Sequence, residues 1–275
     1  MSVPPRGLVE DHPLPPPVFV LGAPRSGTTY LVEVLNRHPQ IFLTNETRVM
    51  AFFNRALNDL ARDEWAIRGH REQFVEHLRA ETAGIVGRFY RRLGAPDGAR
   101  WGDKHPHYAD PVLEPGCLEL IDETFPDAQY LHILRDGRDV AASIVNRGWT
   151  DLDLAADVWR RCVTTAREFG LARGLDRYHE LRYEDLVASG VQVIGRALDF
   201  LGLAEALPVT SFLVEQEHER TPFSGPVTAR QAIGHSGWRE RLTEEQALAV
   251  NDALADVLVE CGYESYAWRR TLPVR

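Results

Sequence analysis

Short apolar runs alternate with longer amphipathic segments along most of the chain. Runs of mostly apolar residues, some followed by a polar turn, predict strands. These runs lie at 18–22, 40–44, 100–108, 128–136 and 178–186. Apolar residues at three-to-four spacing predict helices between them. These segments lie at 26–38, 48–86 (with breaks near 62–63 and 69), 118–125, 137–149, 153–173, 193–203 and 243–263.

This alternation predicts an α/β fold of three layers, in which helices cover both faces of a mostly parallel central sheet. Residues 1–17 form a Pro-rich lead-in, and we expect 18–275 to be one domain with an extra helical region. The segment 221–243 is rich in Gly, Pro and Ser and is too long for a plain connector. Such loops are often functional.

Composition narrows the possible functions. The 275 residues carry a net charge of −9, which argues against nucleic acid or a membrane surface as a partner. The three cysteines are widely spaced, so they indicate neither a disulfide framework nor a zinc site. The chain has no apolar run near the ~18 residues of a membrane span and no apolar signal-peptide core. We therefore expect a cytoplasmic enzyme.

The first predicted strand leads into a phosphate-binding loop that lacks its lysine. The spacing from Gly22 to Gly27 fits G-x-x-x-x-G-K-[ST], but Thr28 stands where the lysine should be. Backbone N–H groups of such a loop and the helix dipole bind anions. The candidate anion-binding residues are Arg25, Ser26, Gly27, Thr28 and Thr29.

A second anion site follows the strand at 128–136. Asp136 stands between Arg135 and Arg138, which makes it a poor Mg²⁺ ligand and indicates an anion bound without a metal. Arg135 lies at the carboxyl end of the predicted strand. Ser143 and Arg147 are four residues apart on the helix that follows, so they would share one helix face and converge. Two anion sites suit a ligand with two phosphate groups.

These two motifs resemble those of PAPS-dependent sulfotransferases, most closely the tyrosylprotein sulfotransferases and their bacterial relatives. PAPS is 3′-phosphoadenosine-5′-phosphosulfate, and PAP is its product. The matching segments are "PRSGTT", "NETRV", "DKHP", "LRDGRDVAASIVNR", "LRYEDLV" and "GWRERLT". The resemblance implies a P-loop-type fold. It also implies that the loop binds the 5′-phosphosulfate and that Arg135 and Ser143 bind the 3′-phosphate, with no metal.

The resemblance also suggests catalytic residues. Arg25 and Lys104 would stabilise the leaving phosphate and the sulfonate. Glu46 would be the general base, with Arg48 as a partner, provided that burial lifts its pKa toward neutrality. The "DKHPH" turn is also similar to the K-T-H-x-P turn of cytosolic sulfotransferases, and in that case His105 or His107 is the base.

Further residues are assigned to the nucleotide by resemblance alone. Tyr183, at the end of a strand, would contact the adenosine, and Arg230 in the long loop would close over the 3′-phosphate. Trp238 and Arg239 would anchor that loop. The helical region 48–92 would shape the site for the acceptor, a hydroxyl of a small molecule, glycan or peptide.

Two alternatives stay open. One is a P-loop kinase or NTPase with a degenerate Walker A loop, which would need the missing lysine and a metal carboxylate. The other is a nucleotide-binding scaffold protein without chemistry. Lys104 and Glu46 argue against a scaffold.

Overall fold

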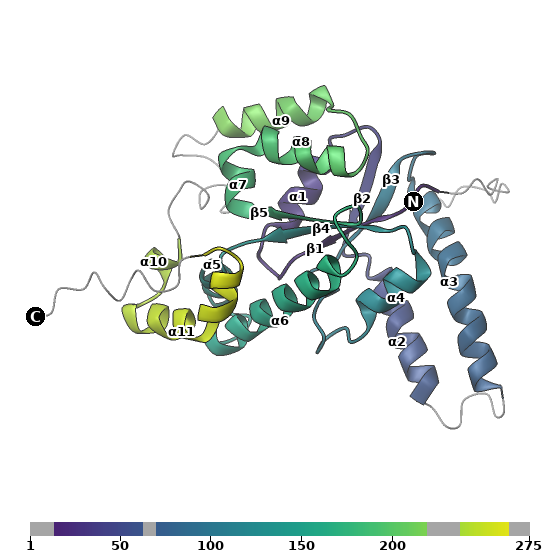
Figure 1. Cartoon of the computed structure of the whole chain (residues 1–275), viewed down its shortest axis with the longest axis horizontal. Coiled ribbons are helices and arrows are strands. Elements are labelled where there is room, and N and C mark those ends of the chain that lie inside the picture. Colours follow the sequence, from purple (N-terminus) through teal and green to yellow (C-terminus); the bar gives the residue numbers. More distant parts are fainter. Residues whose placement is uncertain (1–13, 63–69, 219–236, 264–275) are drawn as a thin grey trace, which may run out of the picture.

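The computed structural model describes residues 14–62, 70–218 and 237–263. Its centre is a sheet of five parallel strands in the order β2-β3-β1-β4-β5 (Figure 1). The strands are β1 (Val18–Leu21), β2 (Ile41–Asn45), β3 (Arg100–Lys104), β4 (Gln129–Leu134) and β5 (Tyr178–Arg182). The central strands are buried on both faces, as the unbroken apolar runs predict.

One face of the sheet is covered by four helices. They are α1 (Thr28–Leu35), α7 (Tyr183–Ala188), α8 (Gly190–Phe200) and α9 (Leu207–His218). Alternate strand residues such as Val18, Val20 and Ile133 pack against them in one buried cluster. On this face, α1 packs against the sheet and begins directly after the loop that follows β1 (Figure 1).

The opposite face is covered by a larger set of helices. They are α2 (Val49–Arg62), α3 (Arg71–Leu93), α4 (Cys117–Thr124), α5 (Gly137–Val145), α6 (Leu152–Leu171), α10 (Trp238–Arg241) and α11 (Glu244–Glu260). Phe19 and Tyr130 pack against α2, α3, α4 and α6. A second cluster joins α5, α6 and α11 beside β4. In Figure 1, α2 and α3 project away from the sheet as a pair.

The observed fold confirms the prediction of a mostly parallel sheet between helical layers. Two details differ. The sequence pattern did not predict α9, which buries only Val209 and Leu213 deeply and is otherwise weakly amphipathic. α5 ends at Val145, earlier than predicted. Among the described residues, no helix has both the length and the apolar character needed to cross a membrane. The proposed domain boundary at residue 18 stays a prediction.

The strand order places a topological switch point between β1 and β4. From β1 the chain crosses to β2 on one side, whereas from β4 it crosses to β5 on the other side. In open α/β sheets, ligands bind where adjacent strands diverge in this way. The loop after β1 and the turn after β4 therefore meet at the place where this architecture usually binds ligands.

The pairing of β1 with β3 depends on Gly102. A Cβ atom at Gly102 would lie 1.8 Å from the carbonyl oxygen of Val18. We expect Gly102→Ala to separate the two strands and to prevent folding to the native state, measured as loss of the cooperative thermal transition. Gly98→Ala is the control. It has open space and φ +74, so it should cost roughly 1–2 kcal/mol and leave the transition cooperative.

Candidate functional site

The loop between β1 and α1 turns tightly at the carboxyl edge of the sheet. Arg25 has φ 72, and Gly27, which precedes the first turn of α1, has φ 97. The Ser26 N–H donates to the Ala23 carbonyl oxygen (3.1 Å) and closes the turn. The N–H groups in the first turn of α1 have no intrahelical acceptor, and the dipole makes this end positive. This geometry suits an anion, and anion binding at the loop stays a prediction.

Tyr183 lies beneath this loop. A Cβ atom on Gly27 would come within 2.4 Å of the Tyr183 ring, so glycine is required by space as well as by φ. The guanidinium of Arg135 stacks on the same ring, 4.4 Å from its centroid. We expected Tyr183 to end a strand, but β5 ends at Arg182 and Tyr183 begins α7. Its ring is buried between the loop and Arg135, and an adenosine contact stays a prediction.

Arg135 has buried donors that no described group accepts. Its side chain follows β4, and Nη1 donates to the carbonyl oxygen of Arg25 (3.1 Å). Nε and Nη2 are buried without a hydrogen-bond partner, as is the hydroxyl of Ser26 in the adjacent loop. Buried polar groups are nearly always satisfied, and an unsatisfied guanidinium is costly. The arrangement fits a bound anion whose oxygens would accept from Arg135 and Ser26.

Arg25 connects the loop to α5. Its Nε donates to the Ser143 hydroxyl (3.1 Å). Burial and the charges of Arg147 and Arg135 lower the pKa of Arg25, so the three guanidinium groups share one small region. Arg147 lies beyond the end of α5, so the prediction that it shares a helix face with Ser143 is wrong. The turn after the helix nevertheless brings it near Arg25.

The remaining loop hydroxyls differ in exposure. Thr28, in the position of the usual lysine, is 4% exposed, and a Cβ on Gly22 would lie 2.8 Å from its Cγ2 methyl. Thr29 is exposed. Thr28 thus fills space beside the strand, and only Thr29 offers its side chain to solvent.

A second group of residues lies where β2 and β3 end. Glu46 follows β2, and Lys104 is the last residue of β3. Lys104 Nζ donates to Glu46 Oε1 (2.7 Å), and Arg48 Nη2 lies 3.9 Å from Glu46 Oε2. The Lys104 side chain is 2% exposed and that of Glu46 is 39% exposed. The structure therefore brings the predicted lysine and glutamate into direct contact, with the glutamate open to solvent.

The environment of Glu46 corrects one expectation. Burial raises the pKa of Glu46, but the hydrogen bond and charge of Lys104, together with the charges of His105 and Arg48, outweigh burial and hold the pKa below its ordinary value. The expectation that burial lifts this pKa toward neutrality is wrong for the protein without a ligand. Glu46 is ionised at neutral pH and is able to accept a proton.

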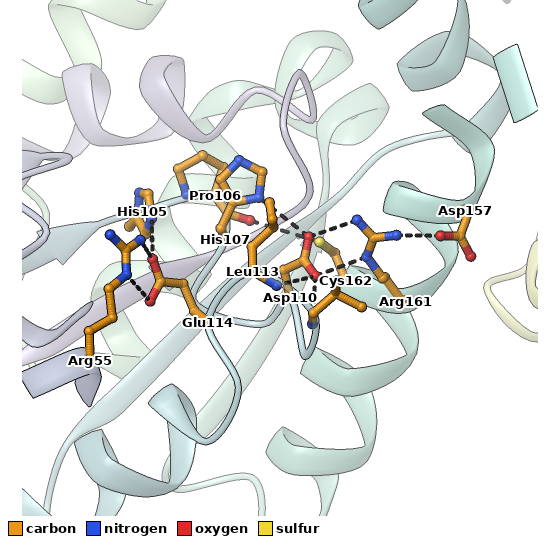
Figure 2. Close-up of polar contacts among 11 residues, drawn as sticks. Arg55, His105, Pro106, His107, Asp110, Leu113, Glu114, Asp157, Arg161 and Cys162 are labelled. Atoms are coloured by element: carbon orange, nitrogen blue, oxygen red, sulfur yellow. Dashed lines mark hydrogen bonds and ion pairs between the residues drawn. The ribbon is translucent and has the colours of Figure 1, made fainter. Parts of the chain in front are cut away.

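His105 and His107 lie in the turn that directly follows β3 (Figure 2). His105 is 2% exposed, and its Nε2 lies 3.9 Å from Glu114 Oε1. Burial and the charges of His107 and Arg48 lower the pKa of His105 to about 4. The buried His105 ring offers less surface to an acceptor hydroxyl than the Glu46 side chain, which is 39% exposed, so exposure favours Glu46 over His105 as the base. His107 as the base stays a prediction.

His107 belongs to the one group in the described part of the chain whose spacing could hold a metal ion, with Asp110 and Cys162 (Figure 2). Arg161 already occupies the carboxylate: its Nε lies 2.9 Å from Asp110 Oδ1, and its Nη2 lies 3.2 Å from Oδ2. Burial raises the pKa of the Cys162 thiol, which disfavours the thiolate. The guanidinium would repel a cation, so the group fits an ion pair better than a metal site.

Asp136 is also unavailable to a metal ion. Its side chain accepts from the backbone N–H of Arg138 (2.9 Å) and caps α5. Arg138 Nε and Nη2 donate to its two oxygens at 3.0 and 2.7 Å. These contacts use the lone pairs that a Walker-type carboxylate would offer to Mg²⁺.

The long loop is described only at its end. Arg230 lies outside the described residues, so its contact with a 3′-phosphate stays a prediction. Trp238 is buried in α10, with Arg138 and Arg239 over its ring at 4.6 and 4.5 Å.

Two contacts close to the site had no signal in the sequence. Arg241 Nη2 donates to Asp139 Oδ1 (3.0 Å) beside Arg135, and the buried carboxylate of Asp103 lies under the turn that carries Glu46. Asp103, Asp139 and Arg241 all lie within the motif segments, but the sequence assigns none of them a role, and only the fold brings these contacts to the site.

A comparison with known families agrees with this geometry. The model of the sulfotransferase family matches residues 16–206. The chain belongs to the sulfotransferase family. The matched region contains the loop after β1, the Glu46–Lys104 pair and the Arg135 site.

Individual relatives support the assignment. The chain is 30% identical over 198 residues to a protein-tyrosine sulfotransferase of Drosophila melanogaster, covering 68% of this chain and 38% of that protein. The sulfotransferase domain from the curacin biosynthetic pathway has a similar fold, with TM-score 0.58 and 19% identity over 91% of this chain and 98% of that one. A mouse sulfotransferase complexed with PAP has TM-score 0.54 and 13% identity over 88% of this chain and 84% of that one. The chain thus spans about two fifths of the length of the fly protein.

The buried His105 makes the stability of the protein depend on pH. The unfolded chain binds a proton near the ordinary histidine pKa of 6.5, whereas folded His105 binds it only near 4. Between these values the unfolded state holds the extra proton, so the free energy of unfolding falls as pH is lowered. We expect His105→Gln to reduce this slope, measured by denaturant unfolding at several pH values in that window. The exposed His77→Gln is the control, and an unchanged slope in His105→Gln would show that His105 protonates freely in the folded state.

Proposed function

We propose that this sulfotransferase moves the sulfuryl group of PAPS to a hydroxyl of a small-molecule, glycan or peptide acceptor, without a metal ion. The observation that carries the proposal is the pair of buried, unsatisfied Arg135 donors beside the loop after β1. They lie at the switch point where this fold binds ligands and next to further cations. The family assignment and the PAP bound to the mouse enzyme support the same donor.

The residues at the switch point divide between the two ends of the donor. Arg135 and Ser143 would bind the 3′-phosphate, with Arg25 and Arg147 adding positive charge. Ser26, Gly27, Thr28 and Thr29 would bind the 5′-phosphosulfate through the first turn of α1. Arg25 contacts Ser143 and Arg135, which are the proposed 3′-phosphate residues. Its guanidinium would therefore stabilise the leaving phosphate and the sulfonate from a position next to the 3′-phosphate site.

Glu46 and Lys104 would carry out the transfer. When the donor binds, its phosphate and sulfonate oxygens compete with Glu46 for the Lys104 ammonium. Glu46 then loses the contact that lowers its pKa and becomes a better base. It takes the proton of the acceptor hydroxyl while the new S–O bond forms. The bond between sulfur and the phosphate oxygen breaks, and Lys104 stabilises the charge left on PAP.

The acceptor would approach Glu46 from the side of α2. Glu46 is exposed there, and α2 begins three residues later at Val49. The side chain of Phe52 on this helix is exposed and offers an apolar surface next to the turn. The fly relative acts on protein tyrosine, so a phenolic hydroxyl is the first acceptor to test. A cytoplasmic location stays a prediction.

A kinase or NTPase is the weaker candidate. The side chain of Thr28 is buried against β1, and Asp136 is held by Arg138, so neither the phosphate-loop cation nor the metal carboxylate of those enzymes is present at its position. The sulfuryl donor requires neither group.

The first test is a thermal-shift comparison of PAP with ATP, each with Mg²⁺ and with EDTA. A ligand at about 100 times its Kd adds about 2.7 kcal/mol to the free energy of unfolding, a shift of about 5 °C for a domain of this size. We expect PAP to stabilise the protein equally with Mg²⁺ and with EDTA. Stabilisation by Mg²⁺-ATP alone would reject the donor assignment and favour the kinase.

Variants separate donor binding from chemistry. Arg135→Ala removes the proposed 3′-phosphate contact, so it should weaken PAP binding in calorimetry by about 1.5–3 kcal/mol. Lys104→Ala and Glu46→Gln should lower kcat, measured with labelled PAPS and a panel of phenols, alcohols and tyrosine peptides, while PAP binding changes less. Arg160→Ala, which removes a surface ion pair with Asp256, is the control. Full turnover by Glu46→Gln would reject Glu46 as the base.

A further inference from the structure

Consecutive residues at the end of β3 point to opposite faces of the sheet. Asp103 is aligned with Phe19 of β1 and Thr44 of β2, whereas Lys104 is aligned with Val20 and Asn45. Lys104 reaches Glu46 directly. Asp103 lies on the face that packs against α2 and α3, is 0% exposed, and has no role in the proposed function, although it begins the "DKHP" segment.

The Asp103 carboxylate binds the turn that carries Glu46. Its Oδ1 accepts from the Thr44 hydroxyl (2.7 Å) and from the backbone N–H of Thr47 (3.2 Å). Its Oδ2 accepts from the Tyr108 hydroxyl (2.7 Å). Thr44 and Thr47 flank Glu46 on both sides, so one buried carboxylate connects the two ends of the turn.

This turn has an unfavourable backbone conformation. Glu46 and Arg48 both have φ 57, in the left-handed region that residues with a side chain seldom adopt. Such residues persist only when the surroundings hold them, and they cluster at functional sites. Besides the Asp103 contacts, the N–H of Glu46 donates to the Lys104 carbonyl oxygen (2.7 Å), and the Tyr90 hydroxyl lies within 3.3 Å of the Thr44 and Thr47 hydroxyls.

We propose that Asp103 is a positioning residue that holds Glu46 in place to take the proton of the acceptor. The inference rests on the proposed function of Glu46. Burying an ionised carboxylate in the core is unfavourable, and no described cation forms an ion pair with Asp103 to offset its burial. Its acceptors instead match the two donors of the turn. A displacement of about 1 Å at a reacting group can lower the rate by about a hundredfold. The position of Glu46 in this turn therefore affects the rate of proton removal directly.

Two substitutions of Asp103 test the role, with kcat and PAP affinity measured separately for each variant. Asp103→Ala removes both acceptors, so kcat should fall by about a hundredfold in folded protein. PAP affinity should stay at the wild-type value, because the PAP site follows β1 and β4. Asp103→Asn keeps an oxygen for Thr44 and Thr47 and an amide for Tyr108, so it should restore most of kcat.

If Asp103→Ala does not fold, Thr44→Val is compared with Tyr108→Phe as a matched pair. Each removes one hydroxyl donor from the same carboxylate, but only Thr44 belongs to the turn. Kcat should fall in Thr44→Val alone, with similar losses of thermal stability in both. Equal kcat in the pair, or wild-type kcat in folded Asp103→Ala, would overturn the inference.

Glu46→Gln distinguishes the proposed base role of Glu46 from the positioning role of Asp103. If Glu46→Gln is fully active, the proposed function of Glu46 fails first. If it is inactive while folded Asp103→Ala keeps wild-type kcat, only the positioning role fails. Crystal structures of the Asp103 variants without ligand give a readout that needs no acceptor: the turn should move in Asp103→Ala and superpose in Asp103→Asn, and an unmoved turn in Asp103→Ala would contradict the proposal.

Discussion

The parallel pairing of β1 with β3 on one side and β4 on the other holds the whole site together. Val20 of β1 is aligned with Lys104 and with Leu131, so the neighbouring strands end close to the same level. The loop with Arg25, the Glu46–Lys104 pair and the turn with Arg135 therefore meet at one edge, although up to 110 residues separate them in sequence. The close approach of Gly102 to the backbone of Val18 makes this alignment possible.

The buried positive charges of the two halves of the site, Lys104 at one and Arg135 at the other, are compensated differently. Lys104 is almost fully buried but has Glu46 as a counter-ion at 2.7 Å. Arg135 is equally buried but has two donors without an acceptor, and it shares its surroundings with Arg25 and Arg147. The first half can stay intact without a ligand, whereas the second gains most from an anion. A chain of net charge −9 thus keeps a strongly positive region at one edge of the sheet, which total charge does not reveal.

The sequence was sufficient for features that arise from local pattern. The strand patterns predicted the five strands and their order along the chain, and the glycine spacing at Gly22 and Gly27 predicted the tight turn between β1 and α1. It was not sufficient where tertiary contacts decide. The end of α5 before Arg147 and the weakly amphipathic α9 depend on packing against other elements. The pKa of Glu46 depends on Lys104, which no local pattern places beside it.

The turn from Thr44 to Arg48 shows why such contacts escape a motif. A left-handed glutamate is disfavoured locally, so no propensity of these residues predicts it. Its conformation follows from Asp103, whose neighbour Lys104 is the residue that Glu46 contacts. One strand end therefore supplies both the group that holds the turn and the group that tunes its carboxylate. The geometry of the base and its pKa are coupled through two adjacent residues, and a change in the register of β3 would disturb both together.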